Sequence, residues 1–348
     1  MIQTISWCDG QVRLLDQRQL PGREAYLNCR NVEQLSRAIE TLAVRGAPLI
    51  GIAGAYGLAL GIWHSPPDRL TVDFERSFRR ISRTRPTAVN LFWALERMQQ
   101  TFERLKAEGG PAIRSRAGLL NQARMIHRED RETCRLIGRF GSELVPKGST
   151  VITHCNTGAL ATGGIGTALG VIATAFRKGR IKRVLVDETR PLLQGARLTA
   201  WELKKLGIPA ILICDNMAAG LMAQGGISCA IVGADRICLN GDFANKIGTY
   251  GLAVSARHHG IPFYVAAPLS SFDRRLRSGK GIPIEQRDSR EVCRLGGRLI
   301  APAGFPACNP SFDVTPGRLV AAFITEQGVI KPPYPDSIGR LVRALLRK

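Results

Sequence analysis

Aromatic residues are scarce in this chain of 348 residues, of which Phe, Trp and Tyr make up only 6%. With so few aromatic side chains and no recognisable nucleic-acid module, the sequence gives no reason to expect nucleic acid as a partner. The formal net charge is nevertheless +21, and it is spread along the chain instead of being gathered in one block. Such a charge favours anionic partners, among which a phosphorylated metabolite fits as well as RNA does.

Signals for export and for membrane insertion are also lacking. Residues 1–7 contain no basic segment followed by a long apolar run, so we expect a cytoplasmic protein. The stretch nearest to a membrane span is residues 47–63, which at about 17 residues is marginal for crossing a bilayer. Because this stretch is rich in glycine and alanine, we expect a helix packed closely inside the protein and no membrane span.

The nine cysteines show no regular spacing. This argues against a disulfide framework and predicts reduced thiols, most of them buried as small apolar side chains. The nearest candidates for metal ligands are the pair Cys229 and Cys238 and the doublet His258–His259, and neither has a second pair at ligand spacing. We therefore expect no metal site.

The length allows about two domains. The first, residues 1–128, is predicted to be smaller and mainly helical, with a short antiparallel sheet that includes Gln11–Leu15. A helix is expected over Val32–Val44, where apolar residues recur at helical spacing. After a polar, glycine-bearing break at residues 106–115, a long helix over residues 119–144 is expected to bridge to the second domain.

The second domain, residues 129–348, is predicted to be an α/β domain. Short apolar runs that end in polar residues alternate with helical stretches; the runs lie at residues 150–155, 184–188, 210–215, 230–235 and 263–266. This alternation predicts a Rossmann-like, doubly wound parallel sheet. Ligands of such sheets bind beyond the carboxyl ends of the strands, where Cys155, Glu188, Asp215 and Asp235 are expected to lie.

A glycine-rich segment, residues 156–170, follows the first of these strands. A dinucleotide-binding protein would carry its fingerprint here, with Asp187–Glu188 at a suitable distance to bind a ribose. The run Gly164–Leu169 lacks the third glycine of that fingerprint, however. Dinucleotide binding and a tight turn that binds no phosphate both stay open on this evidence.

Three predicted helix starts are preceded by basic or amide residues: Arg45–Pro48, Arg85–Thr87 and Asn245–Lys246. Pro48 suits a first helical turn and Thr87 suits a helix cap. Free backbone N–H groups at a helix start attract anions, and a guanidinium adds a bidentate contact to phosphate. Each start alone fits ordinary capping, but the three together favour a phosphate site.

Two residues at the strand ends are candidates for proton chemistry. Cys155 precedes the glycine-rich segment, and a thiol next to a helix start can be tuned towards thiolate. Its neighbour His154 should point to the opposite side of the strand, so the two do not form an obvious dyad. Asp235 follows an apolar run, and a carboxyl at the edge of an apolar site can keep its proton and act as an acid.

Taken together, these segments resemble the methylthioribose-1-phosphate isomerases, which are relatives of the regulatory subunits of translation initiation factor 2B. The similarity runs nearly from end to end, and several long motifs in the right order are more specific than any single one. The segments that carry it are Leu14–Arg18, Val44–Pro48, Arg85–Asn90, Thr153–Thr162, Glu188–Arg197, Asp215–Ala218, Gly233–Arg236, Ala244–Tyr250 and Asn309–Pro316.

The resemblance implies an aldose–ketose isomerase of methionine salvage that acts on 5-methylthioribose 1-phosphate without a cofactor, and we expect a homodimer. It implies that Cys155 and Asp235 are the catalytic pair, with Asp235 as the proton donor. The resemblance therefore argues against dinucleotide binding by the glycine-rich segment. The resemblance further implies that the substrate contacts Arg45, Gly46, Ala47, Arg85, Gln194, Asn245 and Lys246.

Other functions stay open at this stage. A related isomerase of 5-deoxyribose 1-phosphate or ribose 1,5-bisphosphate would use the same catalytic pair. A regulatory binder without activity, like the initiation-factor subunits, is a different class of protein. The presence of both Cys155 and Asp235 in their motifs argues against the latter.

Overall fold

The computed structural model describes residues 2–85 and 89–346. The chain divides into two compact units, one formed by Met1–Arg135 with Gly158–Gly166, the other by Leu136–Thr157 with Thr167–Lys348. Each unit has its own apolar core. The long helix α5 (Ala112–Ser142) contributes residues to both units, and the boundary predicted at residue 128 also falls within it.

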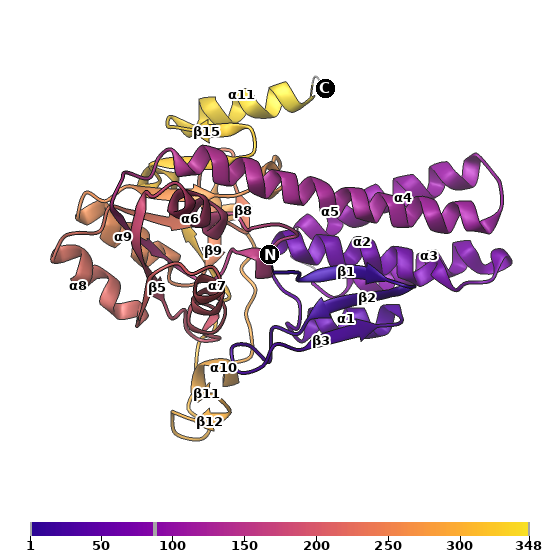
Figure 1. The fold of residues 1–348 in the computed structure, drawn as a ribbon, viewed down its shortest axis with the longest axis horizontal. Coiled ribbons are helices and arrows are strands. Elements are labelled where there is room, and N and C mark those ends of the chain that lie inside the picture. Colours follow the sequence, from indigo (N-terminus) through magenta and orange to yellow (C-terminus); the bar gives the residue numbers. More distant parts are fainter. Residues whose placement is uncertain (1, 86–88, 347–348) are drawn as a thin grey trace. The chain divides into compact units, whose positions relative to one another are not determined.

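The first unit combines a small antiparallel sheet with helices (Figure 1). The strands pair in the order β1-β2-β3 and include the predicted strand over Gln11–Leu15. Apolar side chains of the sheet and of the helices form one core. The elements are β1 (Ile5–Cys8), β2 (Gln11–Leu15), β3 (Tyr26–Cys29), α1 (Val32–Glu40), α2 (Ala47–Trp63), the 3-10 turn η1 (Pro67–Arg69), α3 (Leu70–Ser82) and α4 (Val89–Ala107).

Helix α2 is the predicted buried helix, with the predicted bounds and Pro48 in its first turn. Helices α3 and α4 pack closely against it because glycine leaves room for them. A Cβ on Gly51 would lie 2.7 Å from the carbonyl oxygen of Asn90, and one on Gly54 would lie 2.6 Å from a methyl carbon of Leu91. Among the described residues, no helix combines the length and the apolar character that a membrane crossing requires.

Helix α1 is shorter than the sequence predicts. Asn31 caps its start by accepting a hydrogen bond from the backbone N–H of Gln34, but the helix ends at Glu40 instead of continuing to Val44. The chain turns at Leu42, whose φ of +60° is incompatible with a continuing right-handed helix. The predicted helix cap Thr87 lies outside the described residues.

The second unit is built on a seven-stranded sheet in the order β15-β14-β10-β7-β4-β5-β6. All neighbours pair in parallel except β14 and β15, which are antiparallel. The Rossmann-like, doubly wound sheet predicted from the sequence is therefore confirmed. Its strands are β4 (Ser149–Thr153), β5 (Ile181–Asp187), β6 (Ala210–Ile213), β7 (Cys229–Val232), β10 (Phe263–Ala266), β14 (Ala322–Thr325) and β15 (Gly328–Ile330).

Helices and short turns connect or follow these strands. They are α6 (Ala168–Arg177), the π-helical turn η3 (Gly195–Thr199), α7 (Ala200–Lys205), η4 (Asp215–Met217), α8 (Ala218–Ala223), α9 (Thr249–His258), η5 (Leu269–Ser271), η6 (Gly279–Gly281), α10 (Arg290–Cys293), η7 (Gly317–Leu319) and α11 (Tyr334–Leu346). A second antiparallel sheet has the order β13-β9-β8 and contains β8 (Arg236–Ile237), β9 (Phe243–Lys246) and β13 (Phe312–Thr315).

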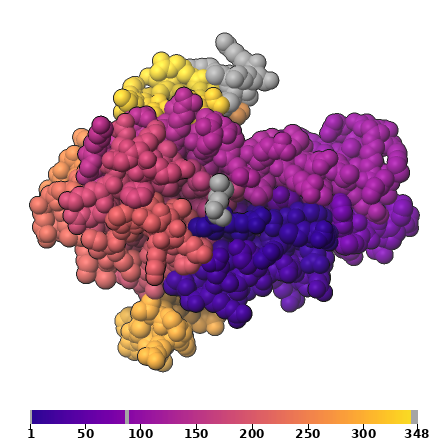
Figure 2. Space-filling model, in the orientation of Figure 1, coloured from indigo at the N-terminus to yellow at the C-terminus, as the bar shows by residue number. Residues whose placement is uncertain are grey.

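A small hairpin of β11 (Arg294–Leu295) and β12 (Arg298–Leu299) projects from the second unit, as the light-orange segment of Figure 2 shows. Its apolar side chains Leu295 and Leu299 are exposed. The antiparallel pairing of its two strands is local, so the hairpin adds nothing to either larger sheet.

The glycine-rich segment does not lead directly from strand to helix, as the sequence suggested. Residues 158–166 belong to the first unit and include the short 3-10 turn η2 (Ala159–Ala161). Helix α6 begins only at Ala168. Residues 157 and 167, at the two ends of this excursion, meet again in the second unit, where the Thr167 N–H donates to the Thr157 carbonyl at 2.8 Å.

Candidate active site

Cys155 lies two residues beyond the end of β4, as predicted. Its side chain is buried, and its φ of +62° places the backbone in the left-handed region that a residue with a side chain rarely adopts. Such a conformation costs about 1–3 kcal/mol and persists only where neighbouring groups hold it. Neighbouring groups must therefore hold the backbone of Cys155 in this conformation.

Two threonines hold the backbone of Cys155 from either side. The N–H of Cys155 donates to the hydroxyl of Thr189 at 2.8 Å, and the hydroxyl of Thr199 donates to the Cys155 carbonyl at 2.6 Å. Both threonines are fully buried. Thr199 ends the π-helical turn η3, a type of turn that is frequent at functional sites.

Gln194 directly precedes the same π-helical turn and is buried. Its side-chain oxygen Oε1 accepts no hydrogen bond from any described residue. An unpaired buried amide oxygen is costly, because it has lost water without gaining a donor. Since a ligand hydroxyl would satisfy it, this atom supports the predicted substrate contact of Gln194.

Next to Cys155, Asn156 links the strand end to helix α7. Its amide nitrogen Nδ2 donates to the Glu202 carboxylate at 2.8 Å and to the Thr199 hydroxyl at 3.2 Å. All three side chains are buried. Thr199 thus receives one hydrogen bond and donates another, which fixes the direction of its hydroxyl towards Cys155.

Asp235 lies three residues beyond the end of β7, the strand that pairs directly with β4. Its backbone N–H donates to the Ala244 carbonyl at 2.9 Å, and its side chain is partly exposed. Gly233 faces Thr157 so closely that a Cβ would collide with that side chain. The structure therefore brings Cys155 and Asp235 to the ends of adjacent parallel strands, where ligands of such sheets bind.

Asn245 and Lys246 end strand β9, just before helix α9. The amide nitrogen of the buried Asn245 donates to the Thr249 hydroxyl at 3.0 Å. The ammonium of Lys246 donates to the Ser311 carbonyl at 2.9 Å and lies 4.8 Å from the centre of the Phe312 ring. Both side chains are thus held by partners within the second unit.

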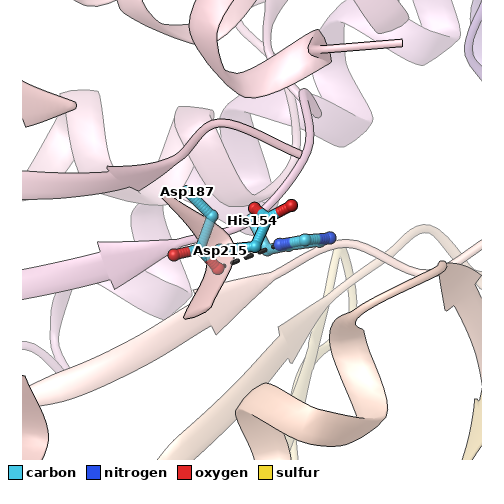
Figure 3. Close-up of side chains that lie close together, drawn as sticks. All are labelled: His154, Asp187 and Asp215. Atoms are coloured by element: carbon cyan, nitrogen blue, oxygen red, sulfur yellow. Dashed lines mark hydrogen bonds and ion pairs between the residues drawn. The ribbon is translucent and has the colours of Figure 1, made fainter. Parts of the chain in front are cut away.

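A buried histidine, His154, lies beside Asp187 and Asp215 (Figure 3). Nδ1 of His154 lies 2.9 Å from an Asp187 carboxylate oxygen, and Nε2 lies 2.8 Å from the Ile247 carbonyl oxygen. Asp215 stands next to them and accepts hydrogen bonds from the backbone N–H groups of Thr189 and Arg190. Although polar atoms of His154, Asp187 and Asp215 lie within 4.8 Å of one another, hydrogen bonds engage both ring nitrogens.

The remaining predicted contacts lie in the first unit. Arg45 donates from Nε to the side-chain oxygen of Gln17 at 3.2 Å. Gly46 has a φ of +94° and precedes Ala47, the first residue of α2. Arg85 lies between α3 and α4. The helix start predicted at Arg45–Pro48 is therefore present, since α2 begins at Ala47 directly after Arg45 and Gly46.

The glycine-rich excursion packs against that helix start. A Cβ on Gly46 would lie 2.6 Å from the Cα and Cβ atoms of Ala161. The side chain of Gln17 donates to the Leu160 carbonyl at 2.7 Å, and the backbone N–H of Gly163 donates to Asp130 at 2.6 Å. The glycines thus serve close packing within the first unit.

Several other thiols are sequestered by burial. Burial raises the pKa of Cys29 to about 11, and it raises the pKa values of Cys229 and Cys238 to about 12. These thiols stay protonated near neutral pH, and their burial is as predicted. They provide internal controls for chemistry at Cys155.

Sequence reasoning missed the supports of Cys155. Thr189, Thr199 and Glu202 are far from Cys155 in sequence, and no spacing rule links them to it. Thr189 does stand in the Glu188–Arg197 motif, two residues beyond the end of β5. The position of a polar residue just beyond a parallel strand was the signal that could have identified it.

The fold defines an α/β protein with a Rossmann-like unit that carries Cys155 and Asp235 beyond adjacent strand ends. Comparison with known proteins identifies the family: the Initiation factor 2 subunit family matches residues 43–332. The chain belongs to this family, and the resemblance inferred from its motifs is confirmed.

The curated relatives are similar over nearly their full length. Methylthioribose-1-phosphate isomerase of Syntrophotalea carbinolica is 52% identical over 344 residues, covering 98% of this chain and 99% of the relative. A protein of Moorella thermoacetica named 5-deoxyribose 1-phosphate isomerase is 51% identical over 345 residues, covering 98% and 97%. Relatives named for two different substrates are thus nearly equally similar to this chain.

Two solved structures extend the comparison. The 5-methylthioribose 1-phosphate isomerase of Pyrococcus horikoshii OT3 has a TM-score of 0.94 at 44% identity, with 99% of this chain and 96% of that chain covered. A structure described as translation initiation factor eIF-2B subunit delta from A. fulgidus has a TM-score of 0.89 at 44% identity, with coverage of 99% and 100%. The expected α/β fold is confirmed.

Proposed function

We propose that this protein is an aldose–ketose isomerase that converts 5-methylthioribose 1-phosphate to 5-methylthioribulose 1-phosphate in methionine salvage. The observation that carries the proposal is the placement of Cys155 and Asp235 beyond the adjacent strands β4 and β7. The names of the curated relatives support the reaction class.

The substrate requires an acid, because its anomeric oxygen is esterified and the ring cannot open to a free aldehyde. In the proposed first step, Asp235 protonates the ring oxygen and the bond from this oxygen to C1 breaks. A positive charge develops at C1 as the ring opens. General acid catalysis of this kind typically contributes 10²–10⁴-fold to the rate.

The second step moves a hydrogen from C2 to C1. In one route, Cys155 as thiolate removes the C2 proton to give an enol-type intermediate. This intermediate is then protonated at C1 while its C2 hydroxyl loses its proton to give the ketone. In the other route, the C2 hydrogen moves to C1 as a hydride while the C2 hydroxyl loses its proton to give the ketone, which requires a site that excludes water. The buried position of Cys155 is compatible with both routes.

For substrate binding, we propose that Arg45 and Arg85 contact the phosphate, together with the backbone of Gly46 and Ala47. The free N–H groups at the start of α2 supply donors for an anion. Gln194, Asn245 and Lys246 would contact the sugar, and the unpaired Oε1 of Gln194 supports a hydroxyl as its partner.

The group at C5 of the substrate distinguishes the alternatives. A 5-deoxyribose 1-phosphate or a methylthio sugar needs an apolar surface at C5, whereas ribose 1,5-bisphosphate needs a further cation. The name of the Moorella thermoacetica relative favours the 5-deoxy sugar as the second candidate. A non-catalytic regulatory binder would show no turnover with any of the three.

A turnover assay tests the proposal. Purified protein is incubated with each of the three sugar phosphates in turn, and the ketose product is followed by NMR. We expect the highest kcat/KM with 5-methylthioribose 1-phosphate. Absence of turnover with all three would contradict the proposed function, and a preference for another substrate would reassign it.

The same assay in deuterated water separates the two routes. Deuterium at C1 of the product would indicate proton transfer through an exchanging group. Its absence would indicate a hydride shift or a base shielded from solvent.

We further propose that the protein is a homodimer. Strand β6 ends the sheet, and its side chains Ile211 and Leu212 are 45% and 51% exposed. An exposed apolar edge strand pairs readily with another chain. A second copy is the natural occupant because isologous pairing covers the same patch on both chains.

Light scattering after size exclusion tests the dimer. We expect wild type and the exposed-hairpin control Leu299→Lys to be dimers, and Ile211→Lys to be a monomer. A monomeric wild type would contradict the dimer, and a dimeric Ile211→Lys would contradict this edge as its interface.

A cytoplasmic location stays part of the proposal and agrees with the buried free thiols Cys29 and Cys229.

A further inference from the structure

His154 is an almost completely buried titratable group next to Cys155, and the proposed mechanism gives it no role. Its side chain is 1% exposed, and that of Asp187 is 3% exposed. It directly precedes Cys155 in the chain, and its ring lies next to Asp187 at the end of β5 (Figure 3). The other ring nitrogen contacts the carbonyl of Ile247, which directly follows β9. Three separate segments therefore meet at one imidazole.

The two hydrogen bonds of His154 need two protons. The Ile247 carbonyl can only accept, so Nε2 of His154 must carry a hydrogen. The link between Nδ1 and the Asp187 carboxylate needs a second proton, on one atom or the other. A neutral imidazole beside an ionised Asp187 has one proton too few. One of the two contacts would then lose its donor.

The surroundings favour the cation. Asp187 on β5, Asp215 on η4 and Asp313 on β13 are the acidic groups whose charges act on His154. Asp313 accepts hydrogen bonds from the N–H groups of Gly248 and Tyr250 at the start of α9. Lys246, the basic residue that precedes Ile247, is held at the Ser311 carbonyl.

We propose that His154 is a positioning residue that, as an imidazolium paired with Asp187, ties the segment of Asn245 and Lys246 to the strand end that carries Cys155. The inference rests on the proposed function. The direct link is the Ile247 carbonyl, which follows Lys246 immediately. Gly248 packs on the ring, since a Cβ there would lie 2.8 Å from Cε1 of His154.

The surroundings of the pair raise the pKa of His154 and thereby favour its protonated form. Burial by itself lowers the pKa of His154, but the hydrogen bond and charge of Asp187 and the charge of Asp215 outweigh it and raise the pKa. Burial raises the pKa of Asp187, and the charge of Asp215 raises it further. The hydrogen bond and the charge of His154 lower it, but the net shift is upward. Because the pKa of His154 is raised, its ion pair with Asp187 stabilises the folded protein fully at pH values below the ordinary histidine pKa near 6.5. This stabilisation is lost as the pH rises through the raised pKa.

Two variants separate positioning from simple stability. His154→Gln can still donate to the Ile247 carbonyl but cannot carry a charge. Asp187→Asn can donate from its amide to Nδ1 of a neutral His154, whose Nε2–H still reaches Ile247. Asp187→Asn therefore keeps both hydrogen bonds without the titrating proton. His258→Gln, at an exposed site on α9, is the matched control for His154→Gln.

The first readout is nitrogen NMR of the wild-type protein labelled at its five histidines. We expect His154, assigned by its loss in His154→Gln, to show both nitrogens protonated above pH 7. His127 is the internal contrast, because burial lowers its pKa and its partners are the Tyr56 hydroxyl and the Gly163 carbonyl. A singly protonated His154 at pH 7 would overturn the inference. This readout needs no turnover, so it stands apart from the proposed function.

The second readout is the pH dependence of KM and kcat with 5-methylthioribose 1-phosphate. In the wild type we expect KM to rise at alkaline pH as His154 loses its proton. His154→Gln should raise KM about 10-fold or more with a smaller effect on kcat. Asp187→Asn should stay within about 3-fold of wild type and lose the alkaline rise. Equal losses in both variants with an unchanged pH profile would overturn the inference, because a merely structural role predicts that result.

Discussion

The hydroxyl of Thr199 offers a sharp test of how Cys155 is held. Thr199→Val preserves the shape of the side chain and removes two hydrogen bonds, one to the Cys155 carbonyl and one from the Asn156 amide. Leaving a buried polar group without its partner costs about 1–3 kcal/mol. That cost is similar to the strain of about 1–3 kcal/mol that a left-handed residue stores. Cys155 can then relax towards negative φ and carry its thiol away from the reacting atoms.

Thr325→Val is the matched control. Thr325 is equally buried in the second unit, donates to the Gly328 carbonyl and accepts from the Gln327 N–H. Urea unfolding should therefore show a loss of about 1–3 kcal/mol for either variant. The two variants should differ in catalysis alone.

Steady-state kinetics measure that difference. A displacement of about 1 Å at a catalytic group can cost about 100-fold in rate, so we expect Thr199→Val to lower kcat about 10–100-fold with little change in KM. Thr325→Val should keep the wild-type kcat. If both variants turned over at the same rate, the left-handed backbone at Cys155 would have no catalytic role and the reasoning would be refuted.

Two further predictions concern binding and cofactors. Arg45→Ala and Arg85→Ala should each lower kcat/KM about 10–150-fold, because a hydrogen bond to a charged group contributes about 1.5–3 kcal/mol. If inorganic phosphate inhibited both variants as strongly as wild type, the phosphate assignment would be contradicted. Turnover should survive dialysis against a chelator, since hydrogen bonds already engage both ring nitrogens of His154; loss of activity that a divalent ion restores would contradict this.

The fold of the second unit could be predicted because its signals are local. Each buried parallel strand is a short apolar run that ends in a polar residue, and this pattern placed Cys155 and Asp235 beyond β4 and β7. The bounds of α2 were predictable for the same reason, since an uncharged, glycine-bearing run is flanked by Gly46 and His64.

What escaped prediction depends on partners distant in sequence. Residues 158–166 leave the strand-to-helix connection because Gln17 and Asp130 offer hydrogen bonds to them in the first unit. Helix α1 ends early because the chain turns at Leu42, where no breaking residue marks the end. His154 was expected only to face away from Cys155, and its partner Asp187 could not be paired with it from spacing.

The catalytic pair itself is tested most directly by the turnover of Cys155→Ser and Asp235→Asn, with substrate binding measured by calorimetry on the same preparations. We expect both variants to bind 5-methylthioribose 1-phosphate and to lose most of their turnover, since a serine hydroxyl and an asparagine amide cannot exchange the required protons near neutral pH. Cys293→Ser, at a partly exposed thiol, should retain the wild-type kcat. Near-normal turnover of either Cys155→Ser or Asp235→Asn would show that residue to be structural and would contradict the mechanism.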